Sequence, residues 1–478
     1  MGDKTQPVVR TVEGAVAGRW RAGMAEFRGI PYARPPVGDL RFAAPVPVSR
    51  WDGTRQATEF GPLPPQSGPV RMESAHETDW LTLNVSTPDP GAAGLPVLVW
   101  LPGGGYVISV SSDPTYDPTL LCGAGLVVVS VNYRVGVEGF ALIDGAPANR
   151  GFLDQIAALD WVRRNISRFG GDSARVCVAG QSAGAGSIAA LLVMAQGLFR
   201  RAITHSVPGI FTLPSLAKKV TAALANGEDL RNVDPWQLAD RLTAFNASLS
   251  GQRDRWGPMA QVGAGVCPVL DASLPKTPWS ALESGVELLV GHTRDEFRLF
   301  SVMAGRVGTF TAEDAQLALD LLAPEPNGYR AAYAGASPEE LMEIVYSDAL
   351  FRMPSQQLAE ANALAGGRSY LFELCLSAPG LGACHSLDVP LAFGTLDSPT
   401  GRQVFGEKPD AATLRVSEEL RQAWIGFATN GDPGWAAYRP DERLTRVLDV
   451  ESKTVPYPEE ASRKIWEHHS PVPFNLPA

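Results

Sequence analysis

The sequence predicts an α/β fold with a mostly parallel central sheet that is covered by helices on both faces. Short apolar runs alternate along the chain with longer stretches of helical periodicity, which is typical of doubly wound α/β proteins. The apolar runs are nearly continuous, as expected for strands that are buried on both faces of a parallel sheet. The predicted strands are residues 97–100, 126–131, 176–179, 286–290 and 370–374.

Helices are predicted between and after these strands. Apolar residues recur at helical spacing over 153–162 and again over 416–427. The second helix is expected to end at Gly431, because glycine and a following proline do not continue a helix.

Two segments lack clear strands, at about 211–284 and about 309–352. We expect them to be helical insertions that cap the sheet, within a single domain that spans residues 1–478. The proline-rich chain beyond about Pro433 is expected to wrap the surface of that domain.

Composition and charge exclude several classes of protein. The chain has 478 residues, of which 45% are hydrophobic and 19% are charged, so it is long enough to bury a large core. Its net charge of -10 argues against a nucleic-acid partner, which calls for clustered lysine and arginine. No run of about 18 apolar residues and no apolar leader is present, which predicts a protein without a membrane span.

The cysteines point to a reducing compartment. There are five, scattered and without a C-x-x-C pair, so we expect free core thiols in a cytoplasmic protein. No pattern of metal ligands is present, and we expect no metal and no cofactor. No feature of the sequence points to a particular oligomeric state.

The strongest local motif is Gly-x-Ser-x-Gly at residues 180–184. It follows a predicted strand and precedes an apolar helical stretch, which is the strand-turn-helix context of a nucleophilic serine in α/β-hydrolases. The two glycines allow close backbone approach, and the following helix N-terminus favours developing negative charge. Ser182 is therefore the candidate nucleophile. The alternative is a tight Gly/Ala-rich crossing that contains a serine by chance.

A serine hydroxyl needs a general base, and the chain order in this fold is nucleophile, acid, histidine. His385 lies in a loop after the last predicted strand, which suits the base. His292 also follows a strand, and the other histidines lie too early or in the C-terminal tail. The six histidines are His76, His205, His292, His385, His468 and His469.

The loop that contains His292 also carries two adjacent carboxylates, Asp295 and Glu296. A carboxylate holds the tautomer of the base and stabilises the imidazolium, so this loop is expected to supply the acid. The spacing alone leaves Asp295 and Glu296 as alternatives.

An oxyanion hole is predicted after the strand at 97–100. Gly103, Gly104 and Gly105 follow it and expose backbone N–H groups without side chains in the way. Together with the N–H of Ala183 they would hold the oxyanion of a tetrahedral intermediate. A flexible glycine turn is the alternative, whereas neither phosphate-binding glycine fingerprint is complete.

Taken together, these motifs resemble the type-B carboxylesterase/cholinesterase family of the α/β-hydrolase superfamily, in its bacterial-type intracellular form. The resemblance runs from about Phe27 to Pro433, which is most of the chain. The segments that carry it are residues 27–41, 79–85, 131–134, 149–155, 169–172 and 424–433, in addition to the motif around Ser182.

The resemblance implies a role for particular residues. The family's acid falls on Glu296 and its histidine on His385. Its oxyanion donors fall on Gly104, Gly105 and Ala183. A serine behind the acid falls on Ser206.

The sequence departs from the family pattern at four positions. Gln181 replaces a frequent glutamate, and Trp80 replaces a cysteine that secreted members pair in a disulfide. Phe297 replaces a glycine after the acid, which is expected to narrow the pocket there. Pro102 replaces a histidine or tyrosine before the glycines, which is expected to alter the shape of the oxyanion hole.

The expected function is hydrolysis of a small-molecule carboxylic ester through an acyl-enzyme on Ser182. An alternative, motivated by Pro102 and Phe297, is acyl transfer, or lactonase, deacylase or cyclase activity on a complex natural product. A non-catalytic binding module is the third hypothesis. Tyr106, Phe211 and Phe393 are candidate pocket residues.

Overall fold

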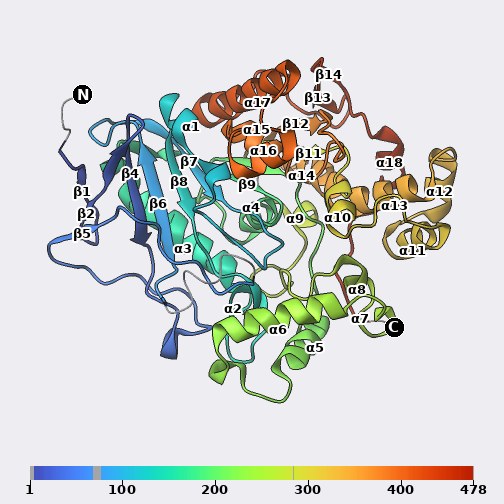
Figure 1. Ribbon diagram of the computed structural model, residues 1–478, viewed down its shortest axis with the longest axis horizontal. Helices are drawn as coiled ribbons and strands as arrows, with labels where there is room; N and C mark the ends of the chain where they lie inside the picture. The colour runs from blue at the N-terminus through green and yellow to red at the C-terminus, as the bar shows by residue number, and fades with distance from the viewer. Residues whose placement is uncertain (1–4, 68–76, 284, 477–478) are drawn as a thin grey trace.

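The centre of the molecule is a large twisted sheet (Figure 1). The computed structural model describes residues 5–67, 77–283 and 285–476, and within them the sheet has eleven strands in the order β14-β13-β12-β11-β10-β9-β7-β8-β6-β4-β3. These strands are β3 (Arg19–Arg21), β4 (Met24–Pro31), β6 (Thr82–Thr87), β7 (Leu95–Leu101), β8 (Val127–Val131), β9 (Gly171–Gln181), β10 (Arg201–His205), β11 (Glu287–Thr293), β12 (Arg368–Leu374), β13 (Leu444–Leu448) and β14 (Lys453–Pro456).

The strands from β8 to β13 are parallel, and those at both edges are antiparallel. All five predicted strands are present and lie in the parallel part. A small second sheet joins three short strands near the N-terminus. They are β1 (Val8–Arg10), β2 (Ala15–Ala17) and β5 (Thr54–Gln56).

Hydrophobic layers cover both faces of the sheet. In β7, Val97, Val99 and Leu101 belong to one buried cluster, whereas Leu98 and Trp100 belong to another on the opposite face. This division follows the period of two in a strand. Residues of α3 and α4 pack in the first cluster, and residues of α15 and α17 pack in the second.

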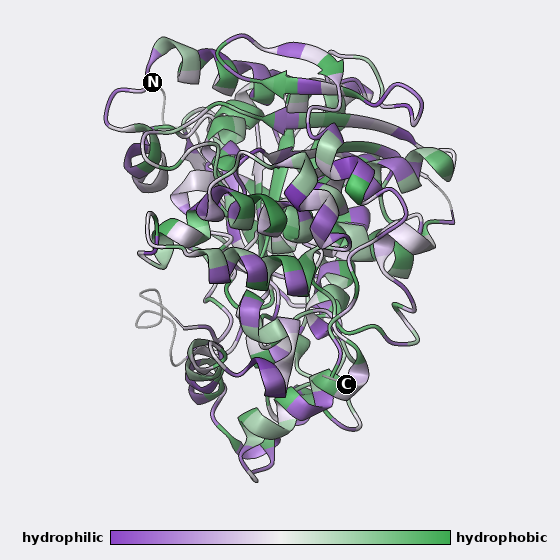
Figure 2. Ribbon diagram, turned by 90° about the vertical axis from the view of Figure 1, so that its right-hand side faces the viewer, coloured by the Kyte–Doolittle hydropathy of each residue, from purple (hydrophilic) through white to green (hydrophobic). Residues whose placement is uncertain are grey.

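The helices fill the connections, and many of them carry both hydrophilic and hydrophobic residues (Figure 2). They are α1 (Thr119–Gly123), α2 (Gly136–Phe140), α3 (Arg150–Asn165), α4 (Ala183–Met194), α5 (Pro214–Ala225), α6 (Pro235–Ser248), α7 (Arg253–Trp256), α8 (Pro258–Val262), α9 (Pro278–Ala281), α10 (Arg298–Met303), α11 (Ala312–Leu322), α12 (Pro326–Ala332), α13 (Pro338–Ser347), α14 (Met353–Leu364), α15 (Asp388–Phe393), α16 (Pro399–Phe405), α17 (Ala411–Asn430) and α18 (Glu460–Ile465). Short 3-10 helices span Gly38–Leu40, Pro114–Tyr116, Ile166–Phe169 and Leu230–Asn232, and a π-helix spans Asp348–Arg352.

The two patchy segments of the sequence are helical, as predicted. The first contains α5 to α9, with α5 and α6 at the bottom of Figure 1, and the second contains α11, α12 and α13 at its right. Residue 284, the predicted end of the first segment, lies outside the described residues.

The C-terminal part differs from the prediction of a surface wrap. α17 ends at Asn430 as expected, and Gly431 caps it with a positive φ of 77°. The chain then returns to the sheet, where β13 pairs with β12 and β14 closes the edge. Both strands are short and partly polar and therefore carry little hydrophobic signal, which is why the sequence pattern missed them.

Candidate active site

The Gly-x-Ser-x-Gly motif forms a sharp turn between β9 and α4. Ser182 has φ 55° and ψ -125°, a strained backbone conformation for a residue with a side chain. Its N–H donates to the carbonyl oxygen of His205 at 2.9 Å, and its carbonyl oxygen accepts from Gly186 at 2.8 Å. Ser182 remains partly exposed although its neighbours are buried. The turn thus presents the hydroxyl at the carboxyl end of the central strand.

Both glycines of the motif are required by close contacts. A Cβ on Gly180 would lie 2.6 Å from the backbone of Gly184. A Cβ on Gly184 would lie only 2.0 Å from the carbonyl oxygen of Leu101 in β7. The turn can therefore pass this close to the neighbouring strand only without side chains at these positions.

A buried histidine–carboxylate pair lies beside this turn. His385 Nδ1 contacts Glu296 Oε2 at 2.5 Å, and the second oxygen of Glu296 accepts from the N–H of Thr293 at 2.9 Å. Glu296 is fully buried and His385 nearly so. This arrangement places a proton on Nδ1 and leaves Nε2 to accept a hydrogen bond.

The neighbouring carboxylate points elsewhere. Asp295 Oδ2 accepts from the N–H of Ala383 at 2.8 Å, and the Arg294 guanidinium pairs with the same carboxylate. Burial opposes this charge, but the bonds from Arg294 and Ala383 hold the pKa of Asp295 below its ordinary range. Asp295 anchors the backbone just before His385, and Glu296 is the carboxylate that contacts the imidazole.

The side chain of Gln181 contacts the other nitrogen of the same ring. Gln181 Nε2 lies 3.0 Å from His385 Nε2. Within the described parts of the chain, no hydrogen bond joins the Ser182 hydroxyl to His385. The sequence singled out Gln181 only as a departure from a family pattern and did not predict this contact.

The glycine run after β7 lies against the nucleophile. A Cβ on Gly103 would lie 3.3 Å from Cβ of Ser182, and Gly104 and Gly105 have φ values of 126° and 61°. In the described residues the N–H groups of Gly104 and Gly105 have no acceptor. The N–H of Ala183, at the first position of α4, has no intrahelical acceptor. Three unengaged donors therefore border the Ser182 turn.

Pro102 is accommodated at the start of this run. It is buried, and its carbonyl oxygen accepts from the Tyr133 hydroxyl at 2.6 Å. The missing N–H of proline thus lies one residue before the glycines and leaves their N–H groups in place.

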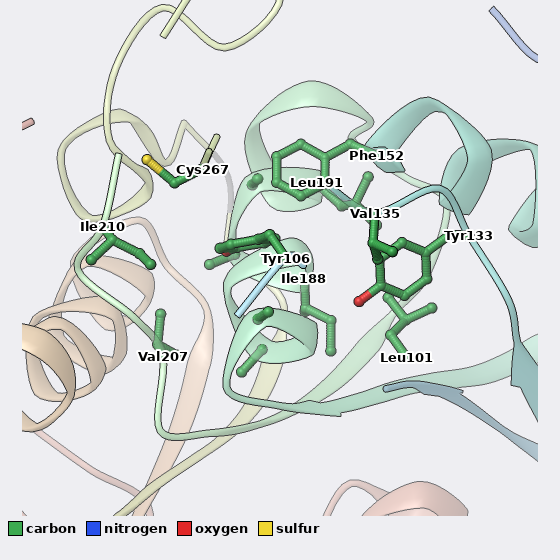
Figure 3. Packing of buried hydrophobic residues seen from close by; sticks show 14 of the residues in the cluster. Leu101, Tyr106, Tyr133, Val135, Phe152, Ile188, Leu191, Val207, Ile210 and Cys267 are labelled. Atoms are coloured by element: carbon green, nitrogen blue, oxygen red, sulfur yellow. The ribbon is translucent and has the colours of Figure 1, made fainter. Parts of the chain in front are cut away.

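The candidate pocket residues Tyr106, Phe211 and Phe393 are all buried in the core. Figure 3 shows Tyr106 packed beside Ile188 of α4. Each ring packs inside a hydrophobic cluster, and Phe393 also borders a surface cavity, so a substrate-contacting role for these residues stays a prediction.

Other aromatic rings contact the histidine instead. The Phe351 ring lies 4.3 Å from the His385 ring and the Phe300 ring 5.4 Å from it, measured between centroids. Phe351 is on the π-helix and Phe300 on α10, so both come from segments whose patterns gave no signal for a site. Phe297 stacks on Tyr346 at 4.1 Å, and it therefore extends this aromatic group.

Two further residues that the resemblance singled out, Ser206 and Trp80, are both buried. The Ser206 hydroxyl is buried and has no hydrogen-bond partner in the described residues, so its support of Glu296 stays a prediction. Trp80 is a buried core residue. The five cysteines are free and buried, as predicted.

His292 is unsuited to act as a base. It is fully buried, accepts from the Tyr457 hydroxyl at 3.1 Å and contacts the Thr293 carbonyl oxygen through Nδ1. Burial lowers the pKa of His292 to about 4. Both ring nitrogens are therefore engaged in the core.

The described residues form neither a cluster of metal ligands nor a helix that could span a membrane. No group of three or more His, Cys, Asp or Glu side chains among them is arranged to hold a metal ion. None of their helices has both the length and the apolar character that crossing a membrane requires.

The chain is similar to known proteins over most of its length. The carboxylesterase family matches residues 5–458. The chain is 35% identical over 489 residues to para-nitrobenzyl esterase of Bacillus subtilis (strain 168), covering 96% of this chain and 98% of that protein. It is also 35% identical over 488 residues to phenmedipham hydrolase of Pseudarthrobacter oxydans, covering 94% and 97%.

Solved structures show the same fold. The carboxylesterase EST55 of Geobacillus stearothermophilus superposes with a TM-score of 0.85 at 30% identity, covering 96% of this chain and 99% of that chain. These similarities confirm the predicted α/β-hydrolase fold. They favour ester hydrolysis over acyl transfer, cyclisation or a non-catalytic role. The chain belongs to the carboxylesterase family and is a serine esterase that hydrolyses carboxylic esters.

Proposed function

We propose that Ser182, His385 and Glu296 form the catalytic triad of this esterase. The observation that carries this proposal is the buried contact of 2.5 Å between His385 and Glu296 beside the strained Ser182 turn. Glu296 accepts a hydrogen bond from the Nδ1–H group, so Nε2 of His385 carries the lone pair that can take the serine proton.

Acylation then follows from the geometry. The Ser182 oxygen attacks the ester carbonyl carbon, and its proton passes to Nε2 of His385. The carbonyl oxygen becomes an oxyanion, which we propose accepts hydrogen bonds from the N–H groups of Gly104, Gly105 and Ala183. The bond to the alcohol breaks, and the leaving oxygen takes the proton from His385.

Deacylation repeats these steps with water. A water molecule attacks the acyl carbonyl and gives one proton to His385. The tetrahedral intermediate collapses, the carboxylic acid leaves and the proton returns to the Ser182 oxygen. Both steps require Nε2, so the Gln181 amide must release this nitrogen when Ser182 engages it.

We further propose esters with an aromatic alcohol group as a substrate class. Two relatives are named for para-nitrobenzyl esters and for phenmedipham. The rings of Phe300 and Phe351 beside His385 offer a surface on which a flat leaving group would pack. Para-nitrobenzyl acetate is the corresponding test substrate.

The organisation of the chain is also a proposal. We propose one domain over residues 1–478, with 211–284 and 309–352 as caps, because one continuous hydrophobic cluster joins the sheet to helices of both segments. The free buried thiols support a cytoplasmic location.

The triad is tested by hydrolysis of p-nitrophenyl acetate and butyrate. Ser182→Ala is expected to lower kcat by a factor of about 10⁴ or more. Ser215→Ala, which changes an exposed serine on α5, is the matched control and should keep wild-type turnover. Wild-type turnover in Ser182→Ala would overturn the proposal.

A further inference from the structure

A second histidine lies close to the Ser182 turn and takes no part in the proposed chemistry. His205 is the last residue of β10 and is fully buried. Its carbonyl oxygen accepts the N–H of Ser182 at 2.9 Å. Its backbone is therefore one of the direct supports of the strained nucleophile turn.

The side chain of His205 reaches a different segment. Its Nδ1 lies 2.7 Å from Oδ2 of Asp388, which is also fully buried. Asp388 is the first residue of α15 and follows His385 by three positions. One residue thus contacts the nucleophile turn through its backbone and the histidine loop through its ring.

The tautomer of His205 is fixed by a third residue. The indole N–H of Trp424, on α17, points to Nε2 of His205 at 3.0 Å. An indole N–H only donates, so Nε2 must carry a lone pair and the ring proton must sit on Nδ1. His205 is consequently a neutral donor to Asp388. Protonation of Nε2 would break the bond to Trp424.

The histidine loop needs such an anchor. Ser386, directly after His385, has φ 66°, a conformation that persists only where the surroundings impose it. On the other side of His385, Asp295 holds the N–H of Ala383 at 2.8 Å. Asp388 holds the loop on the other side, after the strained Ser386, because its carboxylate accepts a hydrogen bond from His205.

We propose that His205 is a positioning residue that ties the Ser182 turn to the His385 loop through Asp388. This inference rests on the proposed roles of Ser182 and His385. The imidazole touches no reacting atom, and it acts by holding the nucleophile and the base at a fixed separation. Displacement of catalytic groups by about 1 Å lowers a rate by about 10²-fold, so loss of this tether is expected to appear in kcat.

The first test separates the tether from simple core stability. His205→Leu/Asp388→Ala removes both partners together, which leaves no unpaired buried charge and keeps the total side-chain volume similar. We expect it to denature close to the wild-type midpoint, with kcat lower by about 10- to 100-fold and KM within about threefold. The rate of Ser182 labelling by a fluorophosphonate should fall by the same factor as kcat.

The matched control is His205→Gln. Its amide can accept from Trp424 and donate to Asp388, so kcat is expected to stay within about threefold of wild type. Wild-type kcat and labelling in the double variant would overturn the proposal. Equal losses in His205→Gln and the double variant would also overturn it, because the two hydrogen bonds would then not matter.

A second pair of variants, Asp388→Asn and Asp388→Ala, tests the proposal if the double variant does not fold. Asp388→Asn keeps an acceptor for His205 and should retain kcat, whereas Asp388→Ala should lose it, and equal kcat values would contradict the tether. Ser182→Ala and His385→Ala are assayed beside them. Activity in either of these variants would contradict the proposed triad itself. An inactive Ser182→Ala beside a fully active double variant would contradict only the proposed tether.

Discussion

The side-chain amide of Gln181 lies 3.0 Å from Nε2 of His385, on the residue next to the nucleophile. An amide N–H can donate to Nε2, and the carboxylate of Glu296 contacts Nδ1 of the same ring. The two contacts hold the His385 ring at both of its nitrogens.

Gln181→Met should therefore raise the rate at which Ser182 reacts. Methionine has a similar length but no amide, so Nε2 of His385 loses a partner that must be released before Ser182 engages this nitrogen. The measurement is kcat/KM for p-nitrophenyl butyrate hydrolysis. An unchanged kcat/KM would show that residue 181 does not influence the base.

Gly184→Ala should damage both activity and stability. The added Cβ would lie 2.0 Å from the Leu101 carbonyl oxygen, so β7 or the Ser182 turn must shift. We expect a loss of about 1–3 kcal/mol in the free energy of unfolding and a fall in kcat of about 10²-fold. Gly123→Ala is the control, because its Cβ meets nothing within 4 Å and its φ is not positive. Normal turnover in Gly184→Ala would contradict the close approach.

A buried ion pair joins the loop after β8 to helix α3. Arg134 contacts both oxygens of Asp154, at 2.8 and 2.7 Å, with both side chains fully buried. Asp154→Asn leaves the arginine charge without its partner and should cost about 3–5 kcal/mol in urea denaturation. The exposed pair of Arg163 and Asp160 is the comparison, since Asp160→Asn should cost under about 1 kcal/mol. Equal losses of unfolding free energy in the two variants would show that burial does not decide how much these ion pairs contribute to stability.

The burial of His292 is expected to lower the free energy of unfolding in acid. Burial lowers its pKa to about 4, below its ordinary value, so the unfolded chain takes up a proton that the folded protein does not. Its contribution is fully present above about pH 6.5 and is lost as the pH falls towards 4, by about 2 kcal/mol at pH 5.

His292→Gln keeps an acceptor for Tyr457 but cannot titrate. The decline in unfolding free energy between pH 7.5 and pH 5 should therefore be shallower in this variant than in the wild type. Chemical denaturation at the two pH values measures the difference. Equal declines would mean that His292 does not contribute to the acid dependence.

The sequence predicted the parts of the structure whose signals are local. The buried strands of the parallel sheet and the glycines at 180 and 184 are recognisable because continuous apolar runs and tight turns restrict residue type. The strands β13 and β14 were missed, since both are short and mix polar with apolar residues.

The choice between Asp295 and Glu296 shows a second limit. Their spacing to His385 differs by one residue, and only the fold shows that Asp295 binds the Ala383 backbone. The partners of Gln181 and His205 are more than 180 positions away, so no local pattern contains them. Such contacts follow from the order of the strands, which brings loops that are distant in sequence together at the carboxyl ends of the parallel strands.

The residue that an organophosphate modifies tests directly whether Ser182 is the nucleophile. The wild-type enzyme is treated with diethyl p-nitrophenyl phosphate, and the adduct is located by peptide mass spectrometry. A single diethylphosphoryl group is expected on the peptide that contains Ser182, with loss of activity in proportion to labelling and no adduct in Ser182→Ala. Modification of another residue, or full inhibition of an active Ser182→Ala enzyme, would contradict the assignment of Ser182 as the nucleophile.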